Sequence, residues 1–337
     1  MVDLSTRYLG LELANPLVAS ASPLSGDLDA LRALADAGAG AIVLPSLFEE
    51  QLEAEAHSSG VGGVAGTESY AEALTYLPRT SAEPGGSHRY LDFVEEAVAS
   101  LEIPVIASLN GTTAQGWVDY ARRIEAAGAV ALELNLYLVA TDLSMDGRAV
   151  ERRHLDVLDA VRAAVSIPIA VKLGPYFSSP GHMALELVAH GADGLVLFNR
   201  FYQPDVDTLT LSLRNDLELS QPSEIRLPLL WIGVLAGRTT ASLAASSGVA
   251  GAEEVVKYLL VGADVVMTTS ALLRHGPGHM AVMLRGLRSW LSARGFSSLD
   301  SVRGLLSHRL LGADDAFERA NYMEVLGSYH RHPGRRG

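Results

Sequence analysis

Apolar runs alternate along this chain with amphipathic stretches, and one junction between the two recurs. A glycine and an alanine followed by an apolar run occur four times, starting at Gly38, Gly128, Gly191 and Gly262. Each copy follows a helix-like stretch, so we interpret the glycine as the left-handed residue that ends a helix before a buried strand begins. The repeated phrase therefore predicts four strand–helix units.

A second phrase predicts the remaining strands. A residue held extended by a following proline precedes an apolar run at Asn15, Ile103 and Ile167. The run from Thr239 has the same character without the proline. Interleaving the two sets predicts eight strands, near 16–22, 41–46, 104–110, 130–137, 168–173, 194–199, 240–247 and 264–270.

Strands that alternate with helices pair in parallel through right-handed crossovers, and eight units close most readily into a (β/α)₈ TIM barrel. An open, doubly wound sheet is the alternative. We expect residues 1–337 to form one domain with a C-terminal tail at about 325–337. Two connections, at about 47–87 and 201–238, are too long for a bare unit and follow predicted strands 2 and 6. They are candidate binding loops or lids, and the second could also form a small sheet over the mouth or a subunit contact.

Charge and composition narrow the class of protein. The formal net charge of -13 argues against nucleic acid or an anionic membrane as a partner, because both require a basic face. The absence of cysteine excludes disulfides, thiolate metal sites and a cysteine nucleophile, and we expect no metal. The chain has no run of eighteen apolar residues, and its first residues lack the features of a signal peptide. We expect a soluble, cytoplasmic protein.

Polar residues gather at the ends of the predicted strands, where barrels keep their chemistry. The set is Ser20, Ser22, Ser46, Asn110, Asn135, Lys172, Asn199, Ser246, Ser247, Thr269 and Ser270. Single serines at such positions often cap the next helix, and a single asparagine is often a turn residue. Lys172 is harder to explain structurally, because an ammonium inside an apolar run needs an anion, a ligand or water. Glu133 and Asn135 are also costly to bury within the apolar run around them.

The last two predicted strands are followed by small and hydroxyl residues, in SSGVAGAEE and MTTSALL. Many barrels bind a phosphate at these loops through backbone N–H groups, and small residues such as Gly248 let the backbone approach it. Simple helix capping is the alternative.

Several of these segments, in this order and spacing, resemble one family. They are NPLVASASPL, ELNL, VKLGPYF, the asparagine that closes GLVLFN, and the glycine-containing turn followed by GADVVM. Over about residues 3–294 the chain resembles the dihydroorotate dehydrogenase family, and more closely the bacterial dihydroorotate dehydrogenase-like proteins. The resemblance implies an FMN-dependent oxidoreductase that transfers hydride from a small cyclic or carboxylate-bearing substrate to FMN. Dihydroorotate, in pyrimidine biosynthesis, is the leading named candidate.

The resemblance also implies roles for individual residues. Lys172 would lie at the pyrimidine edge of the flavin, where a fixed ammonium stabilises the negative charge that hydride transfer leaves. Asn135 would touch both flavin and substrate, and Asn199 would face substrate; these two and Lys172 form the implied catalytic set. The cofactor-binding set is Ala19, Ser20, Ser46, Asn110, Asn135, Lys172, Ser247, Gly248, Thr269 and Ser270.

The chain departs from the family where a proton must move. The position of the catalytic cysteine or serine is Leu138, the amide expected two residues later is Ala140, and Pro45 replaces a lysine. These departures therefore argue more strongly against dihydroorotate oxidation than against flavin binding. Tyr137 is the candidate base if one is needed, although a packed tyrosine is the alternative.

Other roles remain open at this point. The chain could be a non-catalytic or electron-transfer flavoprotein subunit, or a flavin-free, phosphate-binding barrel lyase or isomerase. As partners we expect a small-molecule substrate and a second copy in a homodimer, with membership of a redox complex as a further option. Arg200 could grip a ligand carboxylate or instead pair with Asp205 or Asp207.

Overall fold

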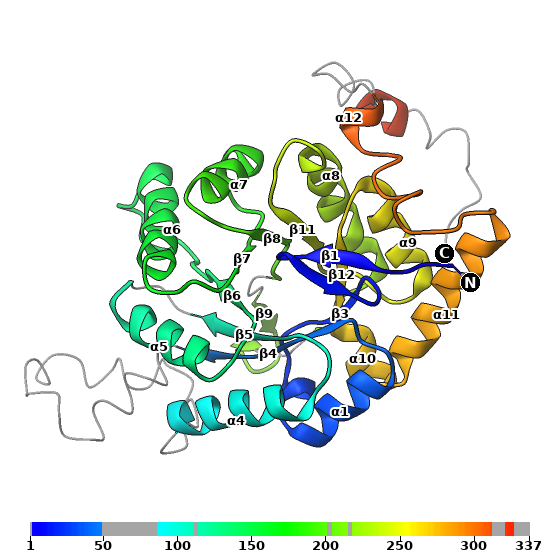
Figure 1. Cartoon of the computed structure of the whole chain (residues 1–337). Helices are drawn as coiled ribbons and strands as arrows, with labels where there is room; N and C mark the ends of the chain where they lie inside the picture. Colours follow the sequence, from blue (N-terminus) through cyan, green and yellow to red (C-terminus); the bar gives the residue numbers. More distant parts are fainter. Residues whose placement is uncertain are drawn as a thin grey trace, which may run out of the picture.

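A closed barrel of eight parallel strands forms the centre of the protein, whose computed structural model describes residues 2–48, 86–110, 114–200, 204–214, 218–311 and 321–326. Helices surround the barrel (Figure 1). The strands are β3 (Leu17–Ala19), β4 (Ala41–Phe48), β5 (Val105–Asn110), β6 (Ala131–Asn135), β7 (Ile169–Leu173), β8 (Gly194–Leu197), β11 (Ser242–Ala245) and β12 (Val265–Thr268). All eight predicted strands are confirmed, and the barrel closes where β12 pairs with β3, which excludes the open sheet.

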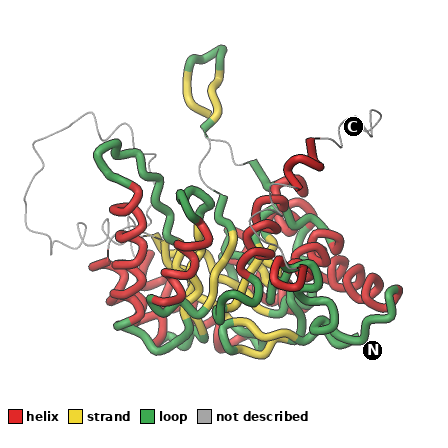
Figure 2. The backbone as a smooth tube through the Cα atoms, turned by 90° about the horizontal axis from the view of Figure 1, so that it is seen from above, coloured by secondary structure: helices red, strands yellow, loops and turns green. Residues whose placement is uncertain are grey.

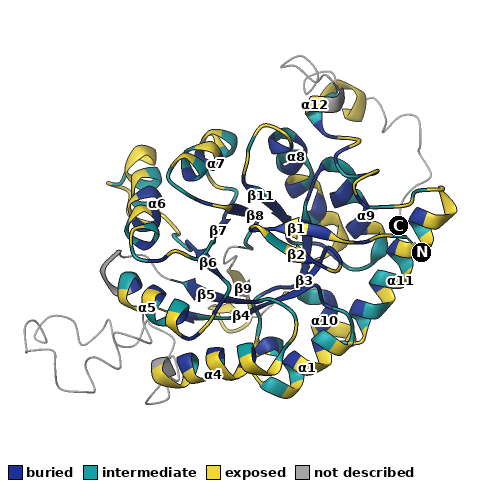
Figure 3. Ribbon diagram, in the orientation of Figure 1, coloured by how far each residue is buried: buried dark blue, intermediate teal, exposed yellow. Residues whose placement is uncertain are grey.

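The outer layer consists of helices, most of which turn their buried residues toward the barrel (Figure 3). They are α1 (Leu28–Asp36), α4 (Gly86–Ser100), α5 (Ala114–Ala126), α6 (Gly147–Arg162), α7 (Pro180–Ala189), α8 (Arg226–Leu235), α9 (Ala252–Val261), α10 (Ser270–His275), α11 (His279–Ala293) and α12 (His308–Leu311). The last of these in chain order, α12, packs on α8 instead. The four glycines of the repeated phrase have positive φ angles between 91° and 115°, as predicted. No helix in the described ranges is long and apolar enough to cross a membrane.

An antiparallel hairpin of β1 (Thr6–Tyr8) and β2 (Leu11–Leu13), which the sequence did not predict, lies across the N-terminal end of the barrel (Figure 1). Tyr8 is only 1% exposed and packs in a cluster with interior alanines from β4, β6, β7 and β11. A Cβ at Gly194 would lie 2.6 Å from Cδ2 of Leu9, so β8 needs a glycine there to admit the hairpin. The hairpin therefore fills the lower interior and leaves the opposite end for a site.

Two insertions follow the C-terminal ends of β4 and β8 along the chain, as predicted. Most of the first, 49–85, lies outside the described residues. The second contains the hairpin of β9 (Asp205–Asp207) and β10 (Ser212–Arg214), which confirms a small sheet. Figure 2 shows the hairpin standing away from the barrel, so the expectation that it covers the mouth is not confirmed. The short 3₁₀ helix η2 (Pro222–Ile225) follows. The last part of the predicted insertion is α8, the barrel helix after β8, and in the predicted tail 327–337 lie outside the described residues.

Candidate functional site

A cavity of about 250 Å³ opens at the C-terminal ends of the strands. It is lined by residues that follow β3, β8, β11 and β12 and by Lys172 on β7. Of the residues predicted at the mouth, the cavity brings together Ser20, Ser22, Lys172, Asn199, Ser246, Ser247, Gly248, Thr269 and Ser270. The lining thus combines hydroxyl groups, the Asn199 amide, the Lys172 ammonium and two further charged residues, Arg200 and Glu218.

Asn135 lies beside this cavity and is joined to it through Asn199. Nδ2 of Asn199 donates a hydrogen bond to Oδ1 of Asn135 at 2.7 Å. Asn135 is 8% exposed, so the bond satisfies a buried amide oxygen. Asn110 at the end of β5 is directly opposite Asn135 in the strand register. Three predicted amides therefore meet at one part of the mouth.

Ala19 and Ser46, like Asn110 and Asn135, do not line the cavity. Ala19 is 1% exposed and immediately precedes Ser20. Oγ of Ser46 lies 2.8 Å from Oγ of Ser108, and the hydroxyl of the partly buried Tyr90 donates to the Ser108 carbonyl. The structure thus places Ser46 in a hydroxyl network between β4 and β5, at the edge of the mouth.

Lys172 has the anionic partner that its burial requires. Its Nζ lies 3.5 Å from Oε1 of Glu133 and donates to Oγ of Ser20 at 3.4 Å. The Lys172 side chain is 9% exposed and that of Glu133 is 1% exposed. The acid and the cation that looked costly in the sequence therefore form one buried ion pair beneath the mouth.

Hydroxyl groups hold the two predicted phosphate-binding turns in place. Oγ of Ser247 donates to the Phe198 carbonyl at 3.1 Å, and Oγ1 of Thr269 donates to the Ser20 carbonyl at 3.2 Å. The Tyr258 hydroxyl donates to the Ser247 carbonyl at 2.8 Å, and burial raises the pKa of this tyrosine well above its usual range. Since these hydroxyl hydrogens are used within the protein, an anion at the turns would be met mainly by backbone N–H groups.

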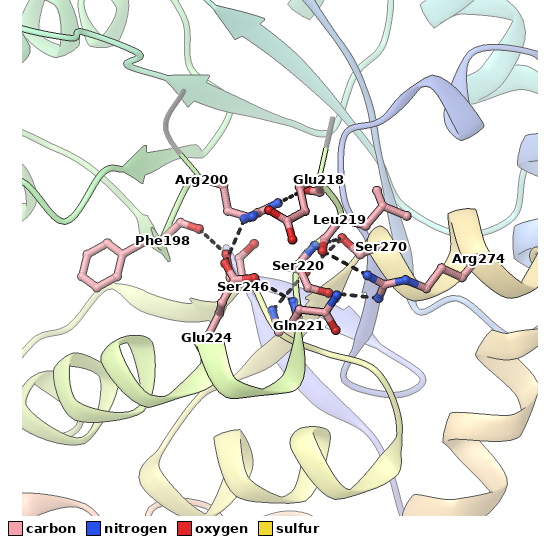
Figure 4. A network of polar contacts seen from close by, with 12 residues as sticks. Phe198, Arg200, Glu218, Leu219, Ser220, Gln221, Glu224, Ser246, Ser270 and Arg274 are labelled. Atoms are coloured by element: carbon pink, nitrogen blue, oxygen red, sulfur yellow. Dashed lines mark hydrogen bonds and ion pairs between the residues drawn. The ribbon is translucent and has the colours of Figure 1, made fainter. Parts of the chain in front are cut away.

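Ser220, which the sequence analysis missed, links the two turns. Its Oγ donates to Oγ of Ser270 at 2.9 Å and accepts from the Gly248 N–H at 3.3 Å, and its own N–H also donates to Oγ of Ser270 (Figure 4). Arg274 fixes the segment by donating to the carbonyls of Leu219 and Ser220, both at 3.0 Å. A single serine at the end of a long insertion carries no periodic signal, so only the fold reveals its position.

The structure gives Gly248 a packing reason that the sequence did not predict. Its φ is +71°, and a Cβ there would lie 2.9 Å from the Ile225 nitrogen and 3.0 Å from the Gln221 carbonyl oxygen. Gly248 therefore makes room for η2 and for Gln221 just before it, the residue that follows Ser220. At the start of α9, the Gly251 N–H donates to Oε2 of Glu254 at 2.9 Å, so the capping alternative holds for that helix.

Arg200 reaches the cavity but is engaged by the protein. Its Nε lies 2.9 Å from Oε2 of Glu224, and its Nη1 bonds the Glu218 carbonyl (Figure 4). Asp205 lies near Arg214 instead, at 4.0 Å. The pairing of Arg200 with Asp205 or Asp207 was therefore wrong, and the arginine joins β8 to the 218–224 segment.

The residues after β6 bring no acid or base to the mouth at the position where the family has one. Leu138 and Ala140 line a separate cavity of about 420 Å³ with His154, Tyr176 and Phe177. Nδ1 of His154 lies 2.8 Å from the Val150 carbonyl, and burial lowers the pKa of this histidine. Across the described ranges, His, Asp and Glu side chains form no group that could hold a metal ion.

The fold and the mouth define a (β/α)₈ barrel with a polar cavity that is lined by the Lys172 ammonium. No family model matches the chain. The chain is 32% identical over 239 residues to "Putative dihydroorotate dehydrogenase A (fumarate)" of Aeropyrum pernix, covering 68% of this chain and 75% of that protein. It is 25% identical to "Dihydroorotate dehydrogenase B (NAD(+)), catalytic subunit" of Methanothermobacter thermautotrophicus, covering 90% of this chain and 98% of that one. It is also 23% identical to "NAD-dependent dihydropyrimidine dehydrogenase subunit PreA" of Escherichia coli K12, covering 93% and 79%.

These relatives are dehydrogenases, and the chain belongs to the dihydroorotate dehydrogenase family. The family resemblance expected from the sequence is confirmed.

Proposed function

We propose that this protein is an FMN-dependent oxidoreductase that takes hydride from a small cyclic or carboxylate-bearing substrate. The observation that carries the proposal is one cavity that joins the Lys172 ammonium, the Asn199 amide bonded to Asn135, and the Ser220–Gly248–Ser270 cluster. An FMN molecule requires a donor set at its phosphate and a cation or donors at its pyrimidine edge. These two requirements correspond to the two ends of the lining.

The space and the donor set fit the cofactor. A second cavity of about 110 Å³ shares Phe198, Asn199, Arg200 and Ser247 with the first. Together the two reach the lower end of the roughly 300–1,000 Å³ typical of ligand pockets. FMN, when bound, would supply a hydride acceptor at N5 and would carry the resulting negative charge at its N1–C2 edge.

Each group of residues has a proposed task. The turns at Gly248 and Ser270, which Ser220 joins, would hold the phosphate mainly through their backbone N–H groups. Lys172, kept in place by Glu133 and Ser20, would face the edge that becomes negative and stabilise it in a dry site. Asn135 and Asn199 would orient a planar substrate, since their mutual hydrogen bond fixes both amides.

The substrate we propose is a ring with a CH–CH bond to be oxidised. The names of the relatives specify dihydroorotate and a dihydropyrimidine, both of which are such rings. Leu138 stands where the family has its base, so we propose that dihydroorotate itself is a slow reductant for this protein. A partner subunit or a homodimer in the cytoplasm, as expected from the sequence, belongs to the same proposal.

One observation favours a second role, that of an electron-transfer flavoprotein subunit. The PreA protein, named as a subunit, is matched over 93% of this chain, and Leu138 and Ala140 bring no group that could move a proton. A flavin in such a subunit would exchange electrons with a partner rather than with a substrate.

The experiment is to purify the protein, release any bound cofactor by denaturation, and identify it by chromatography and mass. The native protein is then mixed anaerobically with dihydroorotate, dihydropyrimidines and NADH while the flavin absorbance is followed. If dihydroorotate or a dihydropyrimidine reduces the bound FMN, the result supports the oxidoreductase. If neither of these cyclic compounds reduces the FMN, the result favours the electron-transfer role. A colourless protein with no affinity for FMN would contradict both and would leave the flavin-free lyase or isomerase.

A further inference from the structure

Glu133 is a buried acid that the proposed chemistry does not use directly. It lies in the middle of β6, where strand alternation sends it into the barrel together with Ala131 below and Asn135 above. It is 0% exposed, and neither carboxylate oxygen has a hydrogen-bond partner. A full charge in such a place is costly unless a counter-charge is close.

Lys172 is that counter-charge, and its position defines what Glu133 can influence. In the strand register Asn135 is opposite Lys172, so Glu133 lies one interior layer below the ammonium. Oε1 of Glu133 is 3.5 Å from Nζ, while Ser20 at the mouth approaches the same Nζ at 3.4 Å. The ammonium thus stands between a buried acid below it and the cavity above it.

Tyr8, on the β1–β2 hairpin, packs in the barrel interior below Glu133 and Lys172. The Tyr8 hydroxyl has no hydrogen-bond partner and the residue is 1% exposed. Burial raises the pKa of Tyr8 well above its usual range, and the negative charge of Glu133 raises it further. The interior beneath Lys172 is therefore shielded from solvent and of low dielectric, so a charge in it acts over a long distance.

We propose that Glu133 is the counter-ion that sets how much positive charge Lys172 presents to the flavin, and so lowers the flavin's reduction potential. This inference rests on the proposed function. Glu133 would not touch the cofactor. It would act through Lys172, by cancelling part of the ammonium's field at the edge of the ring that becomes negative on reduction.

The two partners then have opposite effects on the same quantity. Glu133→Gln keeps the shape and an oxygen that can accept from Lys172, but removes the negative charge, so the reduction potential should rise. A unit charge acting over about 10 Å at an effective dielectric of about 20 changes the ratio of reduced to oxidised flavin on the order of tenfold at a fixed solution potential. Lys172→Met should lower the ratio of reduced to oxidised flavin. Glu133→Asp keeps the charge, so its ratio should stay near that of the wild type.

The test is a spectroelectrochemical titration of the bound flavin in these variants. Asp264→Asn is the matched control, because Asp264 also lies 3.5 Å from a cationic partner, Arg303, but belongs to the hairpin end of the barrel. Asp264→Asn should lower the stability of the protein without changing the reduction potential of the flavin. A higher reduction potential in Glu133→Gln but not in Asp264→Asn supports the proposal. An unchanged reduction potential in Glu133→Gln that still binds flavin overturns it.

A second measurement needs no cofactor. In the apoprotein, a double-mutant cycle of Glu133→Gln and Lys172→Met on the midpoint of urea unfolding should show coupling, with the double variant losing less than the two single losses combined. Additive losses would overturn the pairing on which the inference depends. If the wild-type protein binds no flavin at all, the proposed function falls and this inference falls with it; a flavin whose potential ignores Glu133 removes the inference alone.

Discussion

Asn199 donates a hydrogen bond to Asn135 at 2.7 Å, across the strand β7 that carries Lys172. The bond fixes the oxygen of Asn135 as an acceptor inside the protein and leaves its NH₂ group to act as the donor toward a ligand. Two amides that are separated by 64 positions in the chain thus behave as one rigid recognition element.

Asn199→Asp tests this element. The new carboxylate would face the Asn135 oxygen, so the Asn135 amide must rotate and ligand affinity should fall by about tenfold or more, from the loss of roughly 1–3 kcal/mol. Orotate titration, followed by the perturbation of the flavin spectrum, measures the affinity. Asn321→Asp, within the described segment 321–326 near the end of the chain, makes the same chemical change as a control. Equal orotate affinities in all three proteins would mean that the amide pair is only structural.

Ser220→Ala tests the cluster that joins the two turns. The change removes the acceptor of the Gly248 N–H and one donor to Ser270, so we expect FMN affinity to fall about tenfold. The barrel should persist because Arg274 still holds the Leu219 and Ser220 carbonyls. Fluorescence titration of the apoprotein with FMN gives the dissociation constant, and the exposed Ser212→Ala is the control. An affinity that matches the control would place the phosphate elsewhere.

Leu138→Ser and Leu138→Cys test the missing base. A positioned base typically contributes on the order of 10²–10⁴ in rate. Dihydroorotate should therefore reduce the flavin of the wild-type protein slowly or not at all, and it should reduce the flavin of the two variants faster. Anaerobic stopped-flow absorbance compares the three proteins. Rapid bleaching of the wild type would show that another group, such as Tyr137, supplies the base.

Two buried tyrosines differ in a way that stability measurements can detect. The Tyr8 hydroxyl has no partner, whereas the Tyr258 hydroxyl donates to the carbonyls of Ser246 and Ser247. Tyr8→Phe should leave the free energy of unfolding unchanged or raise it, and Tyr258→Phe should lower it by about 1 kcal/mol. Urea unfolding of both variants measures this. A large loss in Tyr8→Phe would mean that its hydroxyl is bonded, for instance through a buried water to Glu133.

The barrel could be predicted from the sequence because its signals are local. A glycine that ends a helix before an apolar run, or a proline that holds the preceding residue extended, depends only on neighbouring residues. The hairpin β1–β2 was not predicted because its strands are only three residues long and are stabilised by contacts with barrel strands that are distant in the sequence. Nothing near Tyr8 in the chain shows that alanines of four distant strands leave space for its ring.

The site residues likewise divide into those that local sequence signals predict and those that depend on contacts between distant segments. Residues at strand ends, such as Lys172 and Asn199, could be named because barrel topology brings those ends together. Ser220 could not, since its role depends on an insertion folding back onto Gly248 and Ser270. The partner of Lys172 was also hidden, although Glu133 was visible as a costly residue; its distance from the ammonium follows only from the register of β6 and β7.

The central claim is that the mouth binds a flavin through both its phosphate and its ring, and a comparison of FMN with riboflavin tests this most directly. Apoprotein is titrated with each compound by flavin fluorescence. The Gly248, Ser220 and Ser270 cluster should make FMN bind at least tenfold more tightly than riboflavin, which lacks the phosphate. Equal affinities, or no binding of either compound, would contradict the account.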